Sequence, residues 1–116
     1  MNITETSNGA IAVVALEGRL DVLSVSVFRS NRSVIDPEKT VVLDLEKLDF
    51  IDTSGLGAIV GAARVKRDPA CGLVLSCMND QVRRTFALTN TQKLFHIFDD
   101  TGAAIDFAAA RQSART

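Results

Sequence analysis

The sequence predicts an α/β fold with a mixed sheet, an N-terminal hairpin, central parallel strands and about four helices. Short apolar runs rich in β-branched residues alternate with segments of helical periodicity, an order that favours parallel strands joined by helices. An Asn8-Gly9 pair near the start of the chain is a strong signal for a hairpin turn. The 116 residues are enough to bury one hydrophobic core. We therefore expect residues 1–116 to form a single domain.

The first predicted element is an antiparallel hairpin. Asn8-Gly9 would join a short strand around residues 3–6 to a hydrophobic strand from Ile11 to Leu16. A turn over residues 17–21 comes next, and it ends at Asp21.

Two interpretations of the segment after Asp21 are open. Asp21 is a good N-cap, and the apolar residues from 25 to 35 suggest a helix that reaches about Ile35. The many valines and the alternation over residues 23–27 are also compatible with a strand. Asp36-Pro37 ends the segment in either case.

The most informative stretch places the hydroxyl of Ser54 between an apolar strand and an amphipathic helix. Residues 40–45 are almost all β-branched or aliphatic, which is typical of a buried strand. After Ser54, apolar residues recur at helical spacing until Asp68-Pro69; they are Leu56, Ile59, Val60 and Ala63. Ser54 therefore lies at or next to a helix N-cap, where free backbone N–H groups can hold an anion such as a phosphate.

The residues around Ser54 suggest more than a helix cap, although most serines at such a junction only cap a helix. Asp52 and Thr53 are also good caps, so the turn holds three candidates where one suffices. Gly55 and Gly57 would each cost about 1 kcal/mol relative to alanine inside a helix. We interpret the two glycines as residues that leave the Ser54 hydroxyl accessible to another molecule.

The second half of the chain continues the alternation of strands and helices. A strand is predicted through Leu75, and a helix capped by Asn79 or Asp80 would bury Val82 and Phe86 and expose Arg83 and Arg84. A short strand near residues 94–98 precedes a terminal helix, capped within residues 99–101, whose inward residues are Ala104, Ile105 and Ala108. Residues from about 109 to 116 are expected to form a frayed tail.

The charge and hydropathy patterns argue against several classes of partner. The formal net charge is −1, without the basic excess or the interleaved aromatic residues of a nucleic-acid binder. The N-terminus lacks the charged and apolar regions of a signal peptide, and no run of about eighteen apolar residues occurs. We expect a cytoplasmic protein that binds neither nucleic acid nor membrane.

No catalytic or cofactor constellation is complete in the sequence. A serine hydrolase would pair Ser54 with a histidine, and the single His96 lies in an apolar segment. Gly55-Leu56-Gly57 lacks the third glycine of a dinucleotide fingerprint. Cys71 and Cys77 are predicted on one strand about 20 Å apart, where they cannot bridge each other or build a zinc site. We expect no enzymatic activity, cofactor or metal.

The serine turn resembles that of a known family. Asp52-Thr53-Ser54-Gly55-Leu56-Gly57 closely resembles the phosphorylation-site turn of bacterial anti-sigma factor antagonists, which are single STAS domains. Residues 18–21 resemble the turn that this family places after its hairpin, and residues 48–52 resemble its approach to the serine. Residues 82–86 and 93–98 resemble its late helix and closing strand. The spacing agrees from about residue 3 to residue 108.

The resemblance implies a STAS-like fold and a partner switch. In this family the unphosphorylated antagonist binds an anti-sigma factor that is a serine kinase of the histidine-kinase-like ATPase fold, and this frees the sigma factor. The kinase then phosphorylates the antagonist and releases it, and a metal-dependent serine phosphatase reverses the mark.

Carried over to this chain, the resemblance makes Ser54 the phosphoacceptor, although Thr53 is a second hydroxyl beside it. Leu56 would be presented as an apolar contact. The implied partner-binding residues are Asp21, Asp52, Thr53, Ser54, Gly55, Leu56 and Gly57.

Two departures from the family pattern stand out. Arg19 occupies a position that is commonly acidic, which bears on the choice of partner. Asn90-Thr91 replaces a common Gly-Leu, and asparagine tolerates the left-handed backbone that a glycine would supply.

Two other classes of function remain open. The first is a STAS scaffold subunit of a larger signalling or transport complex, without obligatory phosphorylation. The second is an enzyme or nucleotide-binding module, for which the accompanying base, lysine or metal ligands are missing. Oligomeric state would separate the scaffold from the soluble switch.

Overall fold

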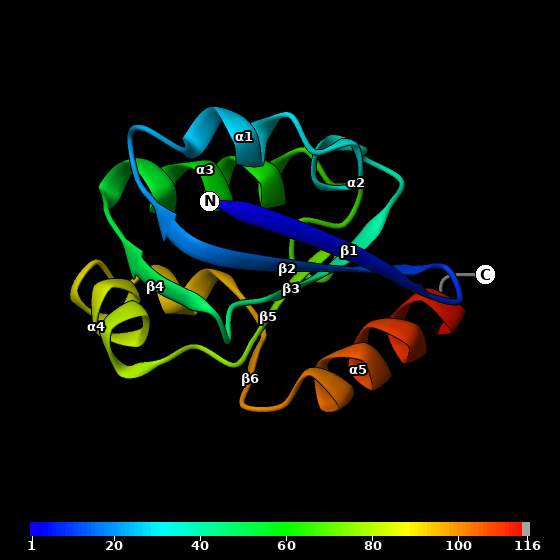
Figure 1. Cartoon of the computed structure of the whole chain (residues 1–116). Coiled ribbons are helices and arrows are strands. Elements are labelled where there is room, and N and C mark those ends of the chain that lie inside the picture. Colours follow the sequence, from blue (N-terminus) through cyan, green and yellow to red (C-terminus); the bar gives the residue numbers. More distant parts are fainter. Residues whose placement is uncertain (115–116) are drawn as a thin grey trace.

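The computed structural model describes the backbone of residues 1–114 and the side chains of residues 1–112 (Figure 1). Within these residues it has six strands, five α-helices and one 3₁₀ helix. The elements in chain order are β1 (Asn2–Asn8), β2 (Ile11–Leu20), α1 (Val25–Arg29), α2 (Arg32–Ile35), β3 (Thr40–Asp44), β4 (Leu48–Ile51), α3 (Thr53–Arg64), β5 (Leu73–Ser76), α4 (Asp80–Leu88), η1 (Thr91–Leu94), β6 (Ile97–Phe98) and α5 (Thr101–Ala114).

The sheet is mixed, as predicted, with the antiparallel part at its N-terminal edge. The strand order is β1-β2-β3-β5-β6, and β4 pairs with β2 off this path. β1 and β2 are antiparallel, whereas the other pairs are parallel. The long strand β2 therefore pairs with β3 along its first half and with β4 along its second half.

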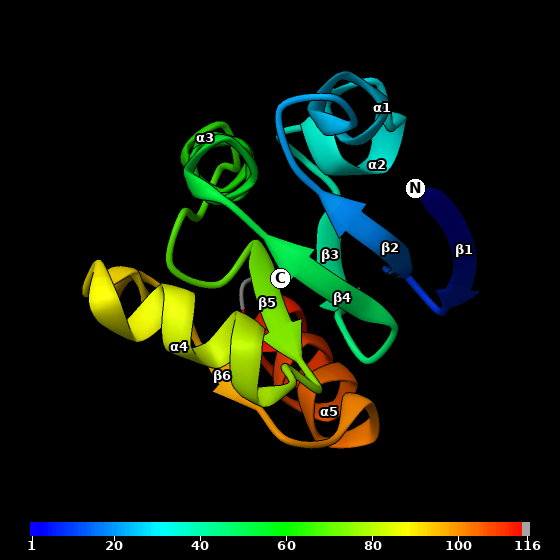
Figure 2. The same ribbon diagram turned by 60° about the vertical axis from the view of Figure 1, so that its left-hand side comes forward.

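Helices cover both faces of the sheet (Figure 2). One face packs with α1, α2, α3 and α4 around a large core that includes Phe28, Ile59 and Phe86. The opposite face packs with α5 through Ala104 and Ala108. Alternate residues of the central strands serve the two cores, because successive side chains of a strand point to opposite faces.

The predicted hairpin is confirmed, and both of its strands are longer than expected. Gly9 takes a φ of +63° in the turn, a conformation that glycine adopts without strain. β2 continues to Leu20 through the segment that was expected to be a turn. Pairing with β4 explains the extra length, because Gly18–Leu20 find a parallel partner there.

The segment between Asp21 and Pro37 is helical, but it is not one helix. It divides into α1 and α2, and Asn31 caps α2 by accepting a hydrogen bond from the Val34 N–H at 3.0 Å. Asn31 can cap a new helix in the middle of this segment, and the segment therefore divides there although its apolar pattern is continuous.

The strand β4 was not predicted, because its four residues hold two polar or half-exposed positions. The helix α3 ends at Arg64, three residues earlier than expected. The last strand was predicted near residues 94–98, but β6 covers only Ile97–Phe98 because η1 extends to Leu94. Asn90, just before η1, has a left-handed φ of +57°, which asparagine tolerates.

The C-terminal helix was predicted with the correct inward face, and Ala104 and Ala108 are fully buried. The expected frayed tail from residue 109 is wrong as far as Ala114, because α5 continues to that residue. Residues 115 and 116 lie outside the described part of the chain. No helix within the described residues has the length and apolar character needed to cross a membrane.

Candidate functional site

The serine turn lies where two parallel strands end side by side. Leu20, the last residue of β2, pairs with Ile51, the last residue of β4. Asp21 and Asp52 follow immediately, and the Asp52 N–H donates to the Leu20 carbonyl at 3.3 Å. Because the carboxyl ends of parallel strands meet at one edge, both aspartates begin loops at the same edge of the sheet.

Asp52 is the N-cap of α3. Its Oδ1 accepts a hydrogen bond from the Gly55 N–H at 2.9 Å, and its carbonyl accepts one from the Leu56 N–H at 2.9 Å. Within the described chain, the N–H groups of Thr53 and Ser54 make no hydrogen bond. These two N–H groups and the positive end of the α3 dipole can therefore receive an anion.

Ser54 is the second residue of α3 and not its cap. Its side chain is half-buried, whereas Thr53 is exposed. In the described structure neither hydroxyl makes a hydrogen bond, so neither is committed to holding the fold. Exposure alone would favour Thr53 as the more reachable hydroxyl.

The two glycines of the turn have different roles, and only Gly57 has the expected one. A Cβ at Gly57 would meet nothing within 4 Å, so this position leaves the surface open. A Cβ at Gly55 would overlap the backbone carbonyl of Leu20 and lie 2.9 Å from Cγ1 of Ile51. Gly55 therefore allows α3 to start against the ends of β2 and β4.

Leu56 is not presented at the surface, contrary to the expectation. It is only 6% exposed and belongs to the core under α3. The sequence placed it between two glycines, but helical periodicity turns it inward beside Ile59 and Ala63.

Exposed apolar side chains occur instead in the loop after Asp21. Val22 is 66% exposed and Leu23 is 89% exposed. Both lie in the segment that was predicted to be either a helix or a strand. Their exposure was not evident from the sequence, because α1 begins only at Val25. Asp21 and Leu23 thus place a charge and an apolar group at the edge that carries Ser54.

A local hydrogen-bond network holds the carboxylate of Asp21. Burial raises the pKa of Asp21, but hydrogen bonds from Leu23, Ser24 and Arg19 together lower the pKa below its ordinary value of 3.8. The Leu23 N–H and the Ser24 hydroxyl donate to Oδ1 at 3.1 and 3.2 Å, and Arg19 Nε donates to Oδ2 at 3.4 Å. Asp21 is therefore an anion at neutral pH with a fixed orientation.

Arg19 contributes to the site in a way that the sequence did not reveal. Its guanidinium lies over the ring of Phe50, 4.1 Å from the centroid, and also pairs with Asp21. Arg19 and Phe50 are register partners on β2 and β4, which is why the two side chains meet. The positive charge is thereby held beside the serine turn.

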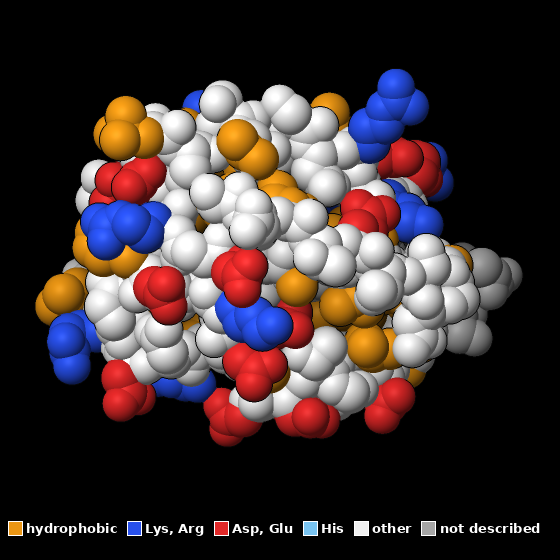
Figure 3. Space-filling view, in the orientation of Figure 1, with side chains coloured by type: hydrophobic (Ala, Val, Ile, Leu, Met, Phe, Trp, Pro, Cys, Tyr) orange, Lys and Arg blue, Asp and Glu red, His pale blue; other side chains and the backbone are white. Residues whose placement is uncertain are grey.

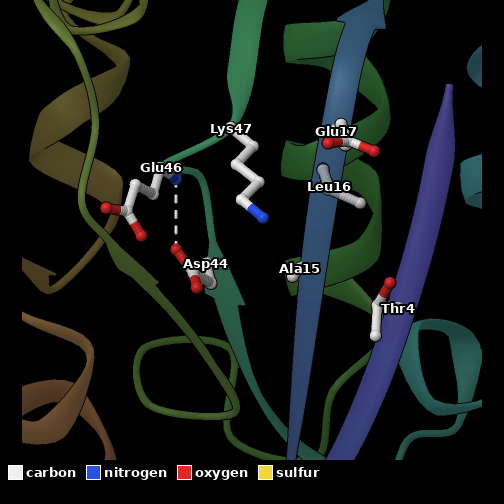
Figure 4. Close-up of a pocket in the computed structure, with 7 residues that line it drawn as sticks. All are labelled: Thr4, Ala15, Leu16, Glu17, Asp44, Glu46 and Lys47. Carbon is white, nitrogen blue, oxygen red and sulfur yellow. Dashed lines mark hydrogen bonds between the residues drawn. The ribbon is translucent and has the colours of Figure 1, made fainter.

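A hollow of about 260 Å³ opens where β2 passes from β3 to β4 (Figure 4). It is lined by polar side chains including Glu17, Asp44 and Lys47. Asp44 accepts a hydrogen bond from the Glu46 N–H at 3.1 Å and so fixes the turn between β3 and β4. In the described residues no group of three or more His, Cys, Asp or Glu side chains is arranged to hold a metal ion.

The family model of the STAS domain matches residues 2–104, which include every strand and the serine turn. This chain belongs to the STAS domain family. The matched residues include the Ser54 turn at the start of α3.

Several relatives of this STAS domain are named anti-sigma factor antagonists. The anti-sigma-B factor antagonist of Staphylococcus aureus is 25% identical over 103 residues, which cover 87% of this chain and 95% of that protein. An anti-sigma factor antagonist from Mycobacterium paratuberculosis has the same fold, with a TM-score of 0.83, 17% identity and coverage of 93% of both chains.

The anti-sigma factor antagonist SpoIIAA has the same fold in two states. Its unphosphorylated form aligns with a TM-score of 0.72 and 21% identity, covering 94% of this chain and 97% of that one. Its phosphorylated form aligns with a TM-score of 0.64 and 20% identity, covering 90% and 97%.

Proposed function

We propose that this STAS domain is an anti-sigma factor antagonist that is switched by phosphorylation of Ser54. In the unphosphorylated state it binds an anti-sigma factor, a serine kinase of the histidine-kinase-like ATPase fold, and so frees a sigma factor. Phosphorylation of Ser54 ends this binding, and a metal-dependent serine phosphatase restores it. The observation that carries the proposal is the uncommitted hydroxyl of Ser54 at the start of α3, beside two N–H groups without a hydrogen bond in the described chain.

The surroundings of Ser54 support a mechanism in which the charge of the phosphate releases the partner. A phosphate adds about −1.5 to −2 charges at neutral pH, and the helix N-terminus can accept it without a change of fold. Asp21 and Asp52 already lie at the same edge of the sheet. Adding the phosphate to these carboxylates makes the surface strongly negative, so that acidic groups of a partner are repelled.

The partner surface of the unphosphorylated state combines the serine turn with the loop after Asp21. Leu23, which is 89% exposed, replaces Leu56 as the apolar contact. The SpoIIAA structures in the unphosphorylated and phosphorylated forms support the idea that a STAS fold of this kind accommodates either state.

The acceptor hydroxyl can be identified directly. The protein is incubated with ATP, Mg²⁺ and each histidine-kinase-like serine kinase of its own genome, and the modified residue is located by fragmentation mass spectrometry. Phosphate is expected on Ser54 in the wild type and in Thr53→Val, and not in Ser54→Ala. Phosphate on Thr53 in the wild type, or undiminished phosphorylation of Ser54→Ala, would show that the acceptor is misassigned.

Binding to the same kinase tests the switch. Ser54→Ala is expected to bind like the unphosphorylated wild type, and Ser54→Asp is expected to bind more weakly because it carries a charge at the start of α3. Equal affinity of both variants would argue against charge as the cause of release. If no such kinase binds or modifies the wild type, the scaffold function gains support, and a stable homo-oligomer in sedimentation would be its expected signature.

A further inference from the structure

A groove of about 280 Å³ separates α3 from α1 and α2. Both sides of the groove belong to the same face of the sheet, where α1 and α2 lie next to α3 (Figure 2). Phe28 and Ala62 form part of its floor, and Ile35 and Val65 form part of its rim. Apolar side chains also reach the surface on the upper side of the molecule, over α1 (Figure 3).

The groove is apolar and wide open. Ile35 and Val65 on the rim are each 48% exposed, although both are large aliphatic residues. A small ligand needs a pocket that buries about 70–90% of its surface, which an open groove does not provide. A helix that lays one apolar face into the groove matches this shape.

The wall formed by α3 is suited to the close approach of another backbone. Gly57 and Gly61 are four residues apart and both line the groove. A Cβ at either position would meet nothing within 4 Å, so packing within this chain does not require these glycines. Each one costs α3 about 1 kcal/mol relative to alanine, whereas a partner helix can pack closely against the bare backbone.

The positive charge in the lining of the groove favours an acidic binding partner. Arg29 lines the groove, and no acidic residue does so. Among the described residues Arg29 forms no ion pair; the three pairs are made by Arg19, Arg67 and Arg83. A helix with apolar residues on one face and carboxylates beside them would complement both the groove and Arg29.

Ser54 lies on the same strip of α3 as the two glycines. At about 100° per residue, Gly57 is displaced by about 60° from Ser54 around the helix axis, and Gly61 by about 20°. Ser54 therefore lies at the N-terminal end of the strip of α3 that lines the groove, and a phosphate on Ser54 would lie at that end of the groove. An acidic occupant would be repelled by that phosphate, while an uncharged or basic occupant would not.

We propose that the groove between α1–α2 and α3 binds an acidic amphipathic helix of the anti-sigma factor partner. This inference rests on the proposed function, and it adds the contact that the phosphate on Ser54 would break. The groove binds the apolar face of the helix, Arg29 pairs with one of its carboxylates, and Gly57 and Gly61 allow close packing.

The first test measures affinity for the kinase that binds the wild type, in a Ser54→Ala background so that no phosphorylation occurs. Gly61→Leu would fill the groove, and Arg29→Glu would reverse its charge; each is expected to weaken binding by about tenfold or more. Arg84→Glu on the exposed face of α4 and Ala110→Leu on the exposed face of α5 lie outside the groove. They are the matched controls for charge and for size, and each is expected to change binding by less than about threefold. Circular dichroism checks that every variant is folded.

A second test does not depend on the kinase. A model helix of about five turns, with leucines on one face and glutamates beside them, is titrated into the ¹⁵N-labelled protein, and a version with lysines in place of the glutamates is the control. Amide shifts are expected at Gly57 and Gly61 with the glutamate helix, and Gly61→Leu should abolish them.

The two tests distinguish a wrong inference about the groove from a wrong proposed function. Unchanged kinase affinity in Gly61→Leu and Arg29→Glu would overturn the inference and leave the proposed function intact. If no kinase binds the wild type, the proposed function is wrong, and the titration with the model helix alone shows whether the groove binds an acidic helix. Shifts outside the groove, no shifts, or equal binding of the lysine helix would overturn the preference for an acidic helix.

Discussion

Gly55 packs directly against Leu20, so closely that any side chain at position 55 would collide with it. A Cβ at Gly55 would overlap the Leu20 carbonyl and lie 2.8 Å from Leu20 Cγ. The first turn of α3 is thereby fixed against the end of β2, at the point where Asp21 leaves the sheet. The position of Ser54 relative to Asp21 depends on this contact.

Gly55→Ala is expected to destabilise the protein, since the Leu20 carbonyl is backbone and cannot move without disturbing the β2–β4 pair. The free energy of unfolding should fall by about 1–3 kcal/mol, as in other overpacked positions. Position 57 is open to solvent, and Gly57→Ala should raise the free energy of unfolding by about 0.5–1 kcal/mol. Urea unfolding of both variants measures the difference, and equal stability of the two would show that the close approach does not exist.

Asp52→Ala should weaken the start of α3. The Gly55 N–H would lose its acceptor, which lies at 2.9 Å in the wild type, and a lost N-cap costs about 0.5–2 kcal/mol. Asp52→Asn retains an acceptor oxygen and should recover most of the loss. Denaturant midpoints give the comparison; an alanine variant as stable as the asparagine variant would mean that the cap contributes little.

The carboxyl of Asp21 should titrate below its ordinary pKa of 3.8 in the folded protein. Burial opposes this by raising the pKa, and the hydrogen bonds from Leu23, Ser24 and Arg19 outweigh it. A carboxyl with a depressed pKa contributes stability that is complete above the unfolded pKa and is lost as the pH falls through the folded pKa. Carboxyl ¹³C shifts followed over pH would report it, and Ser24→Ala should move the pKa upward.

Lys66 should make the protein more stable in mildly alkaline solution. The residue is 3% exposed, and its Nζ donates to the carbonyls of Ser33 and Asp36 at 2.7 and 2.8 Å. Burial lowers the pKa of Lys66 from 10.5 to about 8; Asp36 opposes the shift and Lys39 adds to it.

The sign of the Lys66 effect follows from proton binding. Between pH 8 and 10.5 the unfolded chain holds the proton and the folded protein has lost it, so the free energy of unfolding rises with pH. At about 1.4 kcal/mol per pKa unit, the full rise is on the order of 3–4 kcal/mol. Denaturant unfolding at a series of pH values tests this prediction. In Lys66→Met the free energy of unfolding should rise less steeply with pH, whether the variant is more or less stable than the wild type. An equally steep rise in Lys66→Met would show that other groups cause the effect.

Local signals in the sequence were sufficient for several elements. The hairpin was predictable because Asn8-Gly9 suits a tight turn by its own backbone preferences. The inward faces of α4 and α5 were predictable because helical periodicity separates buried from exposed residues within each segment. Recognition of the Ser54 turn used residues 52–57 together with the other family-like segments, whose spacing agrees from about residue 3 to residue 108.

Features that join distant segments were not predictable from the sequence. β4 is too short and too polar to show a strand pattern, and it forms because the second half of β2 offers it a parallel partner. Leu56 was placed at the surface because its glycine neighbours suggested openness, whereas the packing of α3 on the sheet turns it inward.

The sequence by itself determined the fold class, the hairpin and the helix that starts at the Ser54 turn, because each depends on residues close together along the chain. The choice of Ser54 as candidate phosphoacceptor came from the family resemblance of the sequence. The tertiary structure decided that Gly55 serves packing and Gly57 openness, that Arg19 lies over Phe50, and that Gly61 and Arg29 border one groove. These relationships arise between segments that meet only when β2, β4 and the helices assemble, and no local propensity encodes a distance between them.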